Sequence, residues 1–159
     1  MPTYVALLRG IMPTNPNMKS EKLKGVFESL GFKKVSTVIG SGNVVFTSPS
    51  RDTAALEKKI EAAFPKQLGF TSTTIIRSQR EIEALIKKDP FEGEKDEKPN
   101  YLVVTFFKSR EKELCTVIDL SESKTPQFMS AIEKKHGKEL TTRTWKTVHK
   151  VAQRMASLD

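Results

Sequence analysis

The first fifty residues constrain the fold more than any other part of the chain. Residues 4–8 are apolar on both faces and lead into Arg9-Gly10, which is typical of an inner strand of a sheet. Apolar residues then recur at helical spacing over residues 23–30, and a glycine follows as a stop. Two strand-like runs, 35–39 and 44–47, surround a glycine-rich turn. The chain therefore begins as strand, helix and hairpin.

The next thirty residues extend this pattern to a recognisable unit. Leu56, Ile60 and Phe64 share one face of a second helix, which we expect Pro65 to close. A β-rich run follows over residues 71–77. The order β-α-β-β-α-β is that of ferredoxin-like domains, so we predict an α+β protein with a ferredoxin-like unit over residues 1–78.

The second half predicts a smaller α/β unit over residues 79–159, packed on the first and sharing its core. Ser78 and Glu81 have the spacing of a capping box for a third helix, which ends at Asp89-Pro90. Residues 91–99 are charged and indicate a loop. The remaining expected elements are strands at 101–107 and 114–120 and helices at 125–136 and 144–155.

Size and composition indicate a soluble cytoplasmic protein. The 159 residues are 37% hydrophobic, and no apolar run approaches the roughly 18–20 residues that cross a bilayer. The first residues lack the basic segment of a signal peptide and run directly into a strand pattern. A single cysteine, Cys115, cannot form an internal disulfide, which suits a reducing compartment. We expect no membrane association, and the oligomeric state stays open.

The charge allows two interpretations. The formal net charge is +8. The segment from Lys134 to Arg154 contains seven basic residues and one acidic residue, Glu139. Such clustering attracts phosphate-rich partners. Lysines on helix faces also keep small proteins soluble without any partner, and this plainer interpretation is the more common one.

Three stretches carry a resemblance to a known family. The segments YVALLRGI and SGNVVFTS, and TTRTWKTVHK near the C-terminus, resemble domain-of-unknown-function family 1697. Two departures stand out: Met12-Pro13-Thr14-Asn15 replaces the family's Asn-Val-Gly-Gly, and Thr144 and Lys146 stand where it has Asn. That family has no settled activity, so the resemblance implies the fold and leaves the function open.

The end of the first strand is the first candidate site. In a ferredoxin-like sheet this strand lies antiparallel to the third, so Arg9-Gly10 should meet the hairpin tip, Ser41, Gly42 and Asn43. An arginine, a glycine turn and nearby helix N–H groups together form a plausible anion pocket. In the alternative, Gly42 only serves the turn and Arg9 pairs with a carboxylate.

The last helix is the second candidate. Arg143, Lys146 and Lys150 form a basic surface, on which Trp145 would be available for stacking if exposed. The favoured alternative makes Trp145 a core anchor and the lysines the solvated side of that helix.

Catalytic and metal-binding patterns are sparse. His136 and His149 have no partner at ligand spacing, and the pattern around Cys115 indicates a buried strand residue. No phosphate-loop, dinucleotide or serine-elbow motif occurs, and the aromatic signature of an RNA-recognition motif is missing. We therefore expect no metal and no cofactor.

The leading functional hypothesis is non-enzymatic binding of an anionic small molecule or nucleic acid. The alternative is an enzyme that acts on a phosphorylated or carboxylated metabolite at the same sheet edge. A third possibility, a subunit-interaction module, predicts an exposed apolar patch.

Overall fold

The computed structural model describes residues 1–12, 14–39, 42–91, 100–108, 114–119, 134 and 139–158. The first half contains β1 (Thr3–Leu8), η1 (Pro16–Met18), α1 (Ser20–Ser29), β2 (Lys33–Val38), β3 (Asn43–Thr47), α2 (Thr53–Gln67) and β4 (Thr74–Ser78). The second half contains α3 (Gln79–Lys88), β5 (Asn100–Phe107), β6 (Leu114–Asp119), β7 (Leu140–Thr144) and α5 (Trp145–Ala156). The protein is a mixed α+β structure with two antiparallel sheets.

The first sheet, called sheet A, has the strand order β2-β3-β1-β4. β1 runs antiparallel to both neighbours, with Leu7 opposite Asn43 of β3 and Leu8 opposite Thr74 of β4. The predicted inner position of β1 and its antiparallel pairing with β3 are therefore confirmed. At the opposite end of the same strands, Tyr4 lies opposite Ser78.

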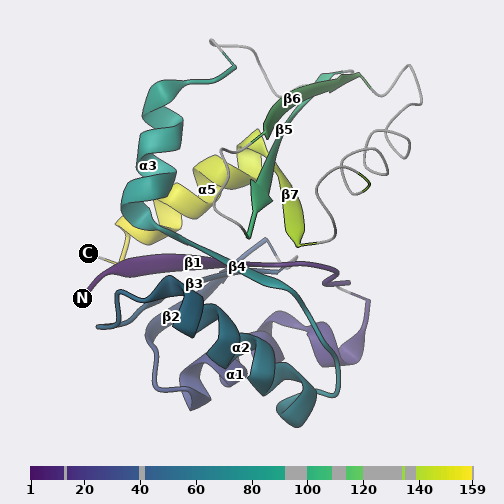
Figure 1. Cartoon of the computed structure of the whole chain (residues 1–159), viewed down its shortest axis with the longest axis vertical. Coiled ribbons are helices and arrows are strands. Elements are labelled where there is room, and N and C mark those ends of the chain that lie inside the picture. The colour runs from purple at the N-terminus through teal and green to yellow at the C-terminus, as the bar shows by residue number, and fades with distance from the viewer. Residues whose placement is uncertain are drawn as a thin grey trace.

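Sheet A is the middle layer of the molecule. In Figure 1, α1 and α2 lie on one side of it, while α3, α5 and the second sheet lie on the other. One apolar cluster joins α1 and α2 to sheet A, and a second joins the opposite face to β5, α3 and α5. All six residues of β1 are buried because both of their faces are covered.

The second sheet, called sheet B, has the order β6-β5-β7. Its strand β7 was not predicted, because Leu140 is the only strongly apolar residue in LTTRT. The segment is extended because its threonines are β-branched and it pairs with β5, where Val104 lies opposite Arg143. Of the helix expected over residues 125–136, only Lys134 is among the described residues, and it is helical.

Local signals set most helix boundaries. Ser78 and Glu81 form the predicted capping box of α3, and Asp89 ends that helix in a left-handed conformation. Pro65 corrects the expectation for α2, since the helix continues through it to Gln67. Pro65 lies in the last turn of α2. Few hydrogen bonds of the helix therefore come after the one that its missing N–H removes. Among the described residues, no helix combines the length and apolarity needed to cross a membrane.

Candidate functional site

The fold brings the ends of three strands together at one end of sheet A. Arg143 of β7 donates from Nε to Oδ1 of Asn43, 2.6 Å away and 100 residues earlier in the chain. Its Nη2 donates to the backbone oxygen of Leu8 at 2.8 Å. The end of β1, the start of β3 and the β7 strand therefore meet around one guanidinium.

Arg143 is saturated with hydrogen bonds. Besides Asn43 and Leu8, it donates to Thr141 Oγ1, to the Thr142 oxygen and, at 3.3 Å, to the Gly42 oxygen. A guanidinium has five N–H donors, so these five acceptors use its capacity. Arg143 thus joins sheet B to sheet A, and this overturns its placement on an exposed basic surface. The physical reason is that β7 pairs with β5 and directs this side chain to the junction between the sheets.

The charge of Arg143 is not balanced by these bonds. Each acceptor is a neutral carbonyl, amide or hydroxyl oxygen. Burial lowers the pKa of Arg143 to about 10, which leaves the side chain charged at neutral pH. The junction therefore holds a positive charge that no carboxylate of the described residues contacts.

Asn43 and Gly42 serve the same junction from the hairpin. Asn43 is 1% exposed, and its amide donates to the Val38 oxygen at 3.1 Å while accepting from Arg143. Gly42 has a φ of +86°, and a Cβ there would lie 2.8 Å from Ile11 Cγ1. Both residues are committed to packing the hairpin against β1. Ser41 lies outside the described residues.

Arg9 and Gly10 have a different environment. Arg9 is half-buried and donates from Nη1 to the Leu140 oxygen at 3.1 Å, so each sheet receives an arginine bond from the other. Together with Glu61 and residues 71–73, Arg9 and Gly10 line a depression of about 470 Å³. Of the five residues predicted for the pocket, these two border an open space.

The chain is similar to a protein family and to a solved structure. The model of a family described as proteins of unknown function, DUF1697, matches residues 1–143. The chain belongs to the DUF1697 family. The solved structure of a conserved bacterial protein, SP0830 from Streptococcus pneumoniae, is similar to it, with a TM-score of 0.75 and 22% identity. The match covers 98% of this chain and 99% of that one, and at this identity it shows the shared fold. No protein with a curated description matches the chain.

The depression in this DUF1697 protein has an ion pair at its border that sequence reasoning missed. Lys108, just after β5, lies 2.6 Å from Glu61 Oε2. The same Glu61 oxygen accepts from the Thr74 N–H at 3.0 Å, which satisfies a donor on the edge strand β4. No spacing in the sequence relates Lys108 to Glu61, because one follows β5 and the other lies on α2.

The last helix of the DUF1697 chain divides the predicted basic surface. Trp145 is only 8% exposed and packs edge-on against Phe91, with ring centroids 5.1 Å apart. It is therefore a core residue and unavailable for stacking on a base, as the favoured alternative expected. Lys146 and Lys150 are exposed, one helical turn apart.

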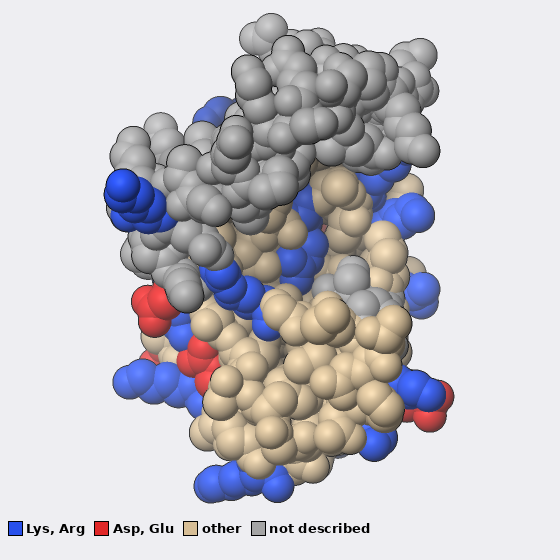
Figure 2. Space-filling view, turned by 90° about the vertical axis from the view of Figure 1, so that its right-hand side faces the viewer, with Lys and Arg blue, Asp and Glu red and all other residues tan. Residues whose placement is uncertain are grey.

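Basic side chains also gather near the middle of one face. Figure 2 shows Lys and Arg side chains near the middle of this face, above its tan lower part. Among the described residues of this DUF1697 protein, no group of three or more His, Cys, Asp or Glu is arranged to hold a metal ion.

Proposed function

We propose that the protein binds a small anionic ligand, without catalysis, in the depression that Arg9 and Gly10 line. The observation that carries this proposal is the uncompensated charge of Arg143 directly behind the end of β1. Leu8, whose oxygen receives the Arg143 bond, precedes Arg9 in the chain. Arg9 lines the depression, and Arg143 is bonded to the residue that precedes Arg9.

The electrostatic argument concerns charge rather than donor count. Hydrogen bonds to neutral oxygens satisfy the N–H groups of Arg143 but leave its full positive charge in a partly buried setting. A nearby anion interacts more strongly there than in bulk water, because the effective dielectric constant is lower. Arg9 and the backbone of Gly10 would contact the ligand, while Arg143 would act as a positioning residue.

The state of Glu61 favours binding over catalysis. A general acid or base needs a carboxyl group that is available to the substrate. Both Glu61 oxygens instead receive Lys108, and one also receives a backbone N–H. This carboxylate is occupied in joining α2 to the two sheets.

We also propose a ferredoxin-like unit over residues 1–78 and a smaller α/β unit over 79–159. The order of the elements and the strand order β2-β3-β1-β4 support the first unit. The single cysteine, Cys115, supports a reducing cytoplasmic location.

A ligand screen by thermal shift tests the binding proposal. The parent and Arg9→Ala are each heated with phosphorylated metabolites, dicarboxylates and short oligonucleotides. A ligand at about 100 times its dissociation constant should add about 2.7 kcal/mol of apparent stability to the parent. That gain should vanish in Arg9→Ala and persist in Lys24→Ala, an exposed charge-matched control on α1.

Two results would reject the proposal. A gain that is unchanged in Arg9→Ala for every stabilising ligand would leave no ligand at this depression. Stabilisation by oligonucleotides alone, with an affinity that falls steeply with salt, would replace a small ligand with nucleic acid.

A further inference from the structure

A second cavity, larger than the Arg9 depression, lies at the other end of sheet A. It has a volume of about 590 Å³ and is bordered by the start of β1, the segment before α2 and the first turn of α3. It lies beside Tyr4 and Ser78, which pair across β1 and β4, whereas the Arg9 depression lies past Leu8 and Thr74. The cavity is therefore separate from the site of the proposed function.

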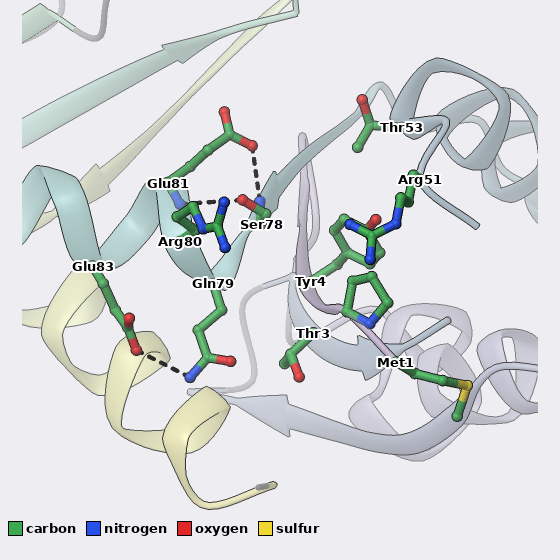
Figure 3. A pocket seen from close by; sticks show the side chains of 11 residues that line it. Met1, Thr3, Tyr4, Arg51, Thr53, Ser78, Gln79, Arg80, Glu81 and Glu83 are labelled. Carbon is green, nitrogen blue, oxygen red and sulfur yellow. Dashed lines mark hydrogen bonds between the residues drawn. The ribbon is translucent and has the colours of Figure 1, made fainter. Parts of the chain in front are cut away.

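Two arginines lie on opposite sides of this cavity. Arg51 comes from the segment before α2 and Arg80 from the first turn of α3, as Figure 3 shows. Both are exposed, and in the described part of the chain neither has a hydrogen-bond or ion-pair partner. They contrast with Arg143, which has five acceptors.

Their positions go against a local preference. The start of a helix carries a partial positive charge, so a cation there is disfavoured by about 0.3–1 kcal/mol. Arg51 immediately precedes the N-cap Asp52 of α2, and Arg80 is the second residue of α3. Helix stability therefore does not account for either arginine.

Nearby acidic residues are engaged with their own helices. Glu81 accepts from the Ser78 N–H at 3.0 Å, and Glu83 accepts from Gln79 Nε2 at 3.0 Å. Asp52 accepts from the Ala55 N–H. Glu81 and Glu83 keep their negative charge and also line the cavity, so an anion here would depend on direct hydrogen bonds from the two guanidinium groups.

The size and lining of the cavity indicate the class of ligand. Its volume lies within the roughly 300–1,000 Å³ of small-molecule sites, well above what a lone phosphate needs. Hydroxyl groups of Thr3, Thr53 and Ser78 border it, which suits a polar ligand body. Guanidinium groups bind phosphate oxygens with paired N–H donors.

We propose that this cavity binds the phosphate group of a small polar phosphate monoester between Arg51 and Arg80. The phosphate dianion receives one cation from each side, and the hydroxyl-bearing walls receive the rest of the molecule.

Calorimetric titration with glycerol 2-phosphate and with inorganic phosphate tests this inference. The variant combines Arg51→Ala and Arg80→Ala, and its control combines Lys58→Ala and Lys87→Ala. The control removes the same charge from exposed positions on α2 and α3, outside the cavity. We expect the affinity for glycerol 2-phosphate to fall at least tenfold in the variant and less than twofold in the control.

Further variants separate this site from the proposed function. Arg9→Ala should keep its affinity for glycerol 2-phosphate, so the two sites succeed or fail independently. The combination Arg51→Lys and Arg80→Lys should bind at an intermediate level, because lysine keeps the charge and loses the paired donors. An equal loss in the control, unchanged affinity in the alanine variant, or no binding by the parent at millimolar concentration would each overturn the inference.

Discussion

Three arginines near the two ends of sheet A, Arg143 at one and Arg51 and Arg80 at the other, have opposite environments. At the Arg9 end, the guanidinium of Arg143 is enclosed and donates to five neutral oxygens. At the Tyr4 end, Arg51 and Arg80 are exposed and lack partners among the described residues. Arg143 therefore holds the two sheets together, while Arg51 and Arg80 remain available.

The difference between the two ends shows what makes an arginine available to an anion. Net charge and clustering identify neither role, because all three arginines contribute equally to the +8 of the chain. The number of unoccupied N–H donors separates them. A saturated guanidinium can influence a ligand only through its field, whereas an unsaturated one can bind it directly.

The largest expected effect is the loss of Arg143. Arg143→Ala leaves Asn43 Oδ1 and the Leu8 oxygen without their donor at a partly buried junction. We expect the free energy of unfolding to fall by about 3 kcal/mol. Urea denaturation followed by circular dichroism measures this, and a loss below about 1 kcal/mol would remove the contrast between the two ends.

A smaller effect is expected at the hairpin. Gly42→Ala forces a left-handed φ on alanine and brings its Cβ to 3.0 Å from the Leu8 oxygen. We expect a loss of about 2 kcal/mol in unfolding free energy, from backbone strain and overpacking together. Gly69→Ala is the matched control, because its φ is +76° but no atom lies within 4 Å of the added carbon. Equal losses in the two variants would mean that close approach to β1 contributes nothing.

The smallest effect should come from the open end. Arg51→Ala combined with Arg80→Ala should change the unfolding free energy by no more than about 0.5 kcal/mol, since exposed side chains without partners contribute little. Ser78→Ala removes the N-cap of α3 and should lower the unfolding free energy by about 1 kcal/mol. This control shows that the measurement detects destabilisation at this end of sheet A. Destabilisation by the arginine pair equal to that of Ser78→Ala would give those arginines a structural role.

Prediction from sequence worked where short-range signals act. The apolar run of β1, the capping box of α3 and the inward stripe of α5 each depend on neighbours within a few residues. Prediction failed at β7, where LTTRT has almost no apolar pattern and becomes a strand through its pairing with β5. Pro65 similarly suggested a stop that the packed helix α2 overrides.

For the candidate site, the sequence identified segments that meet in the structure. It did not show which of their side chains are enclosed and which line a depression. Arg9, Asn43 and Arg143 do meet at one end of sheet A, and of these three Arg9 is the one that lines the described depression. Arg51 and Arg80 were missed as a pair, although a basic residue at each of two helix starts was a readable signal.

The sequence by itself determined the order of elements, the inner position of β1 and the family, because these depend on local periodicity and on recognisable segments. Only the tertiary structure decided which arginines are buried and which are available. That choice depends on hydrogen-bond acceptors supplied by residues up to 135 positions away, such as the Leu8 oxygen that receives Arg143. Local patterns carry no information about such acceptors until the two sheets are in contact.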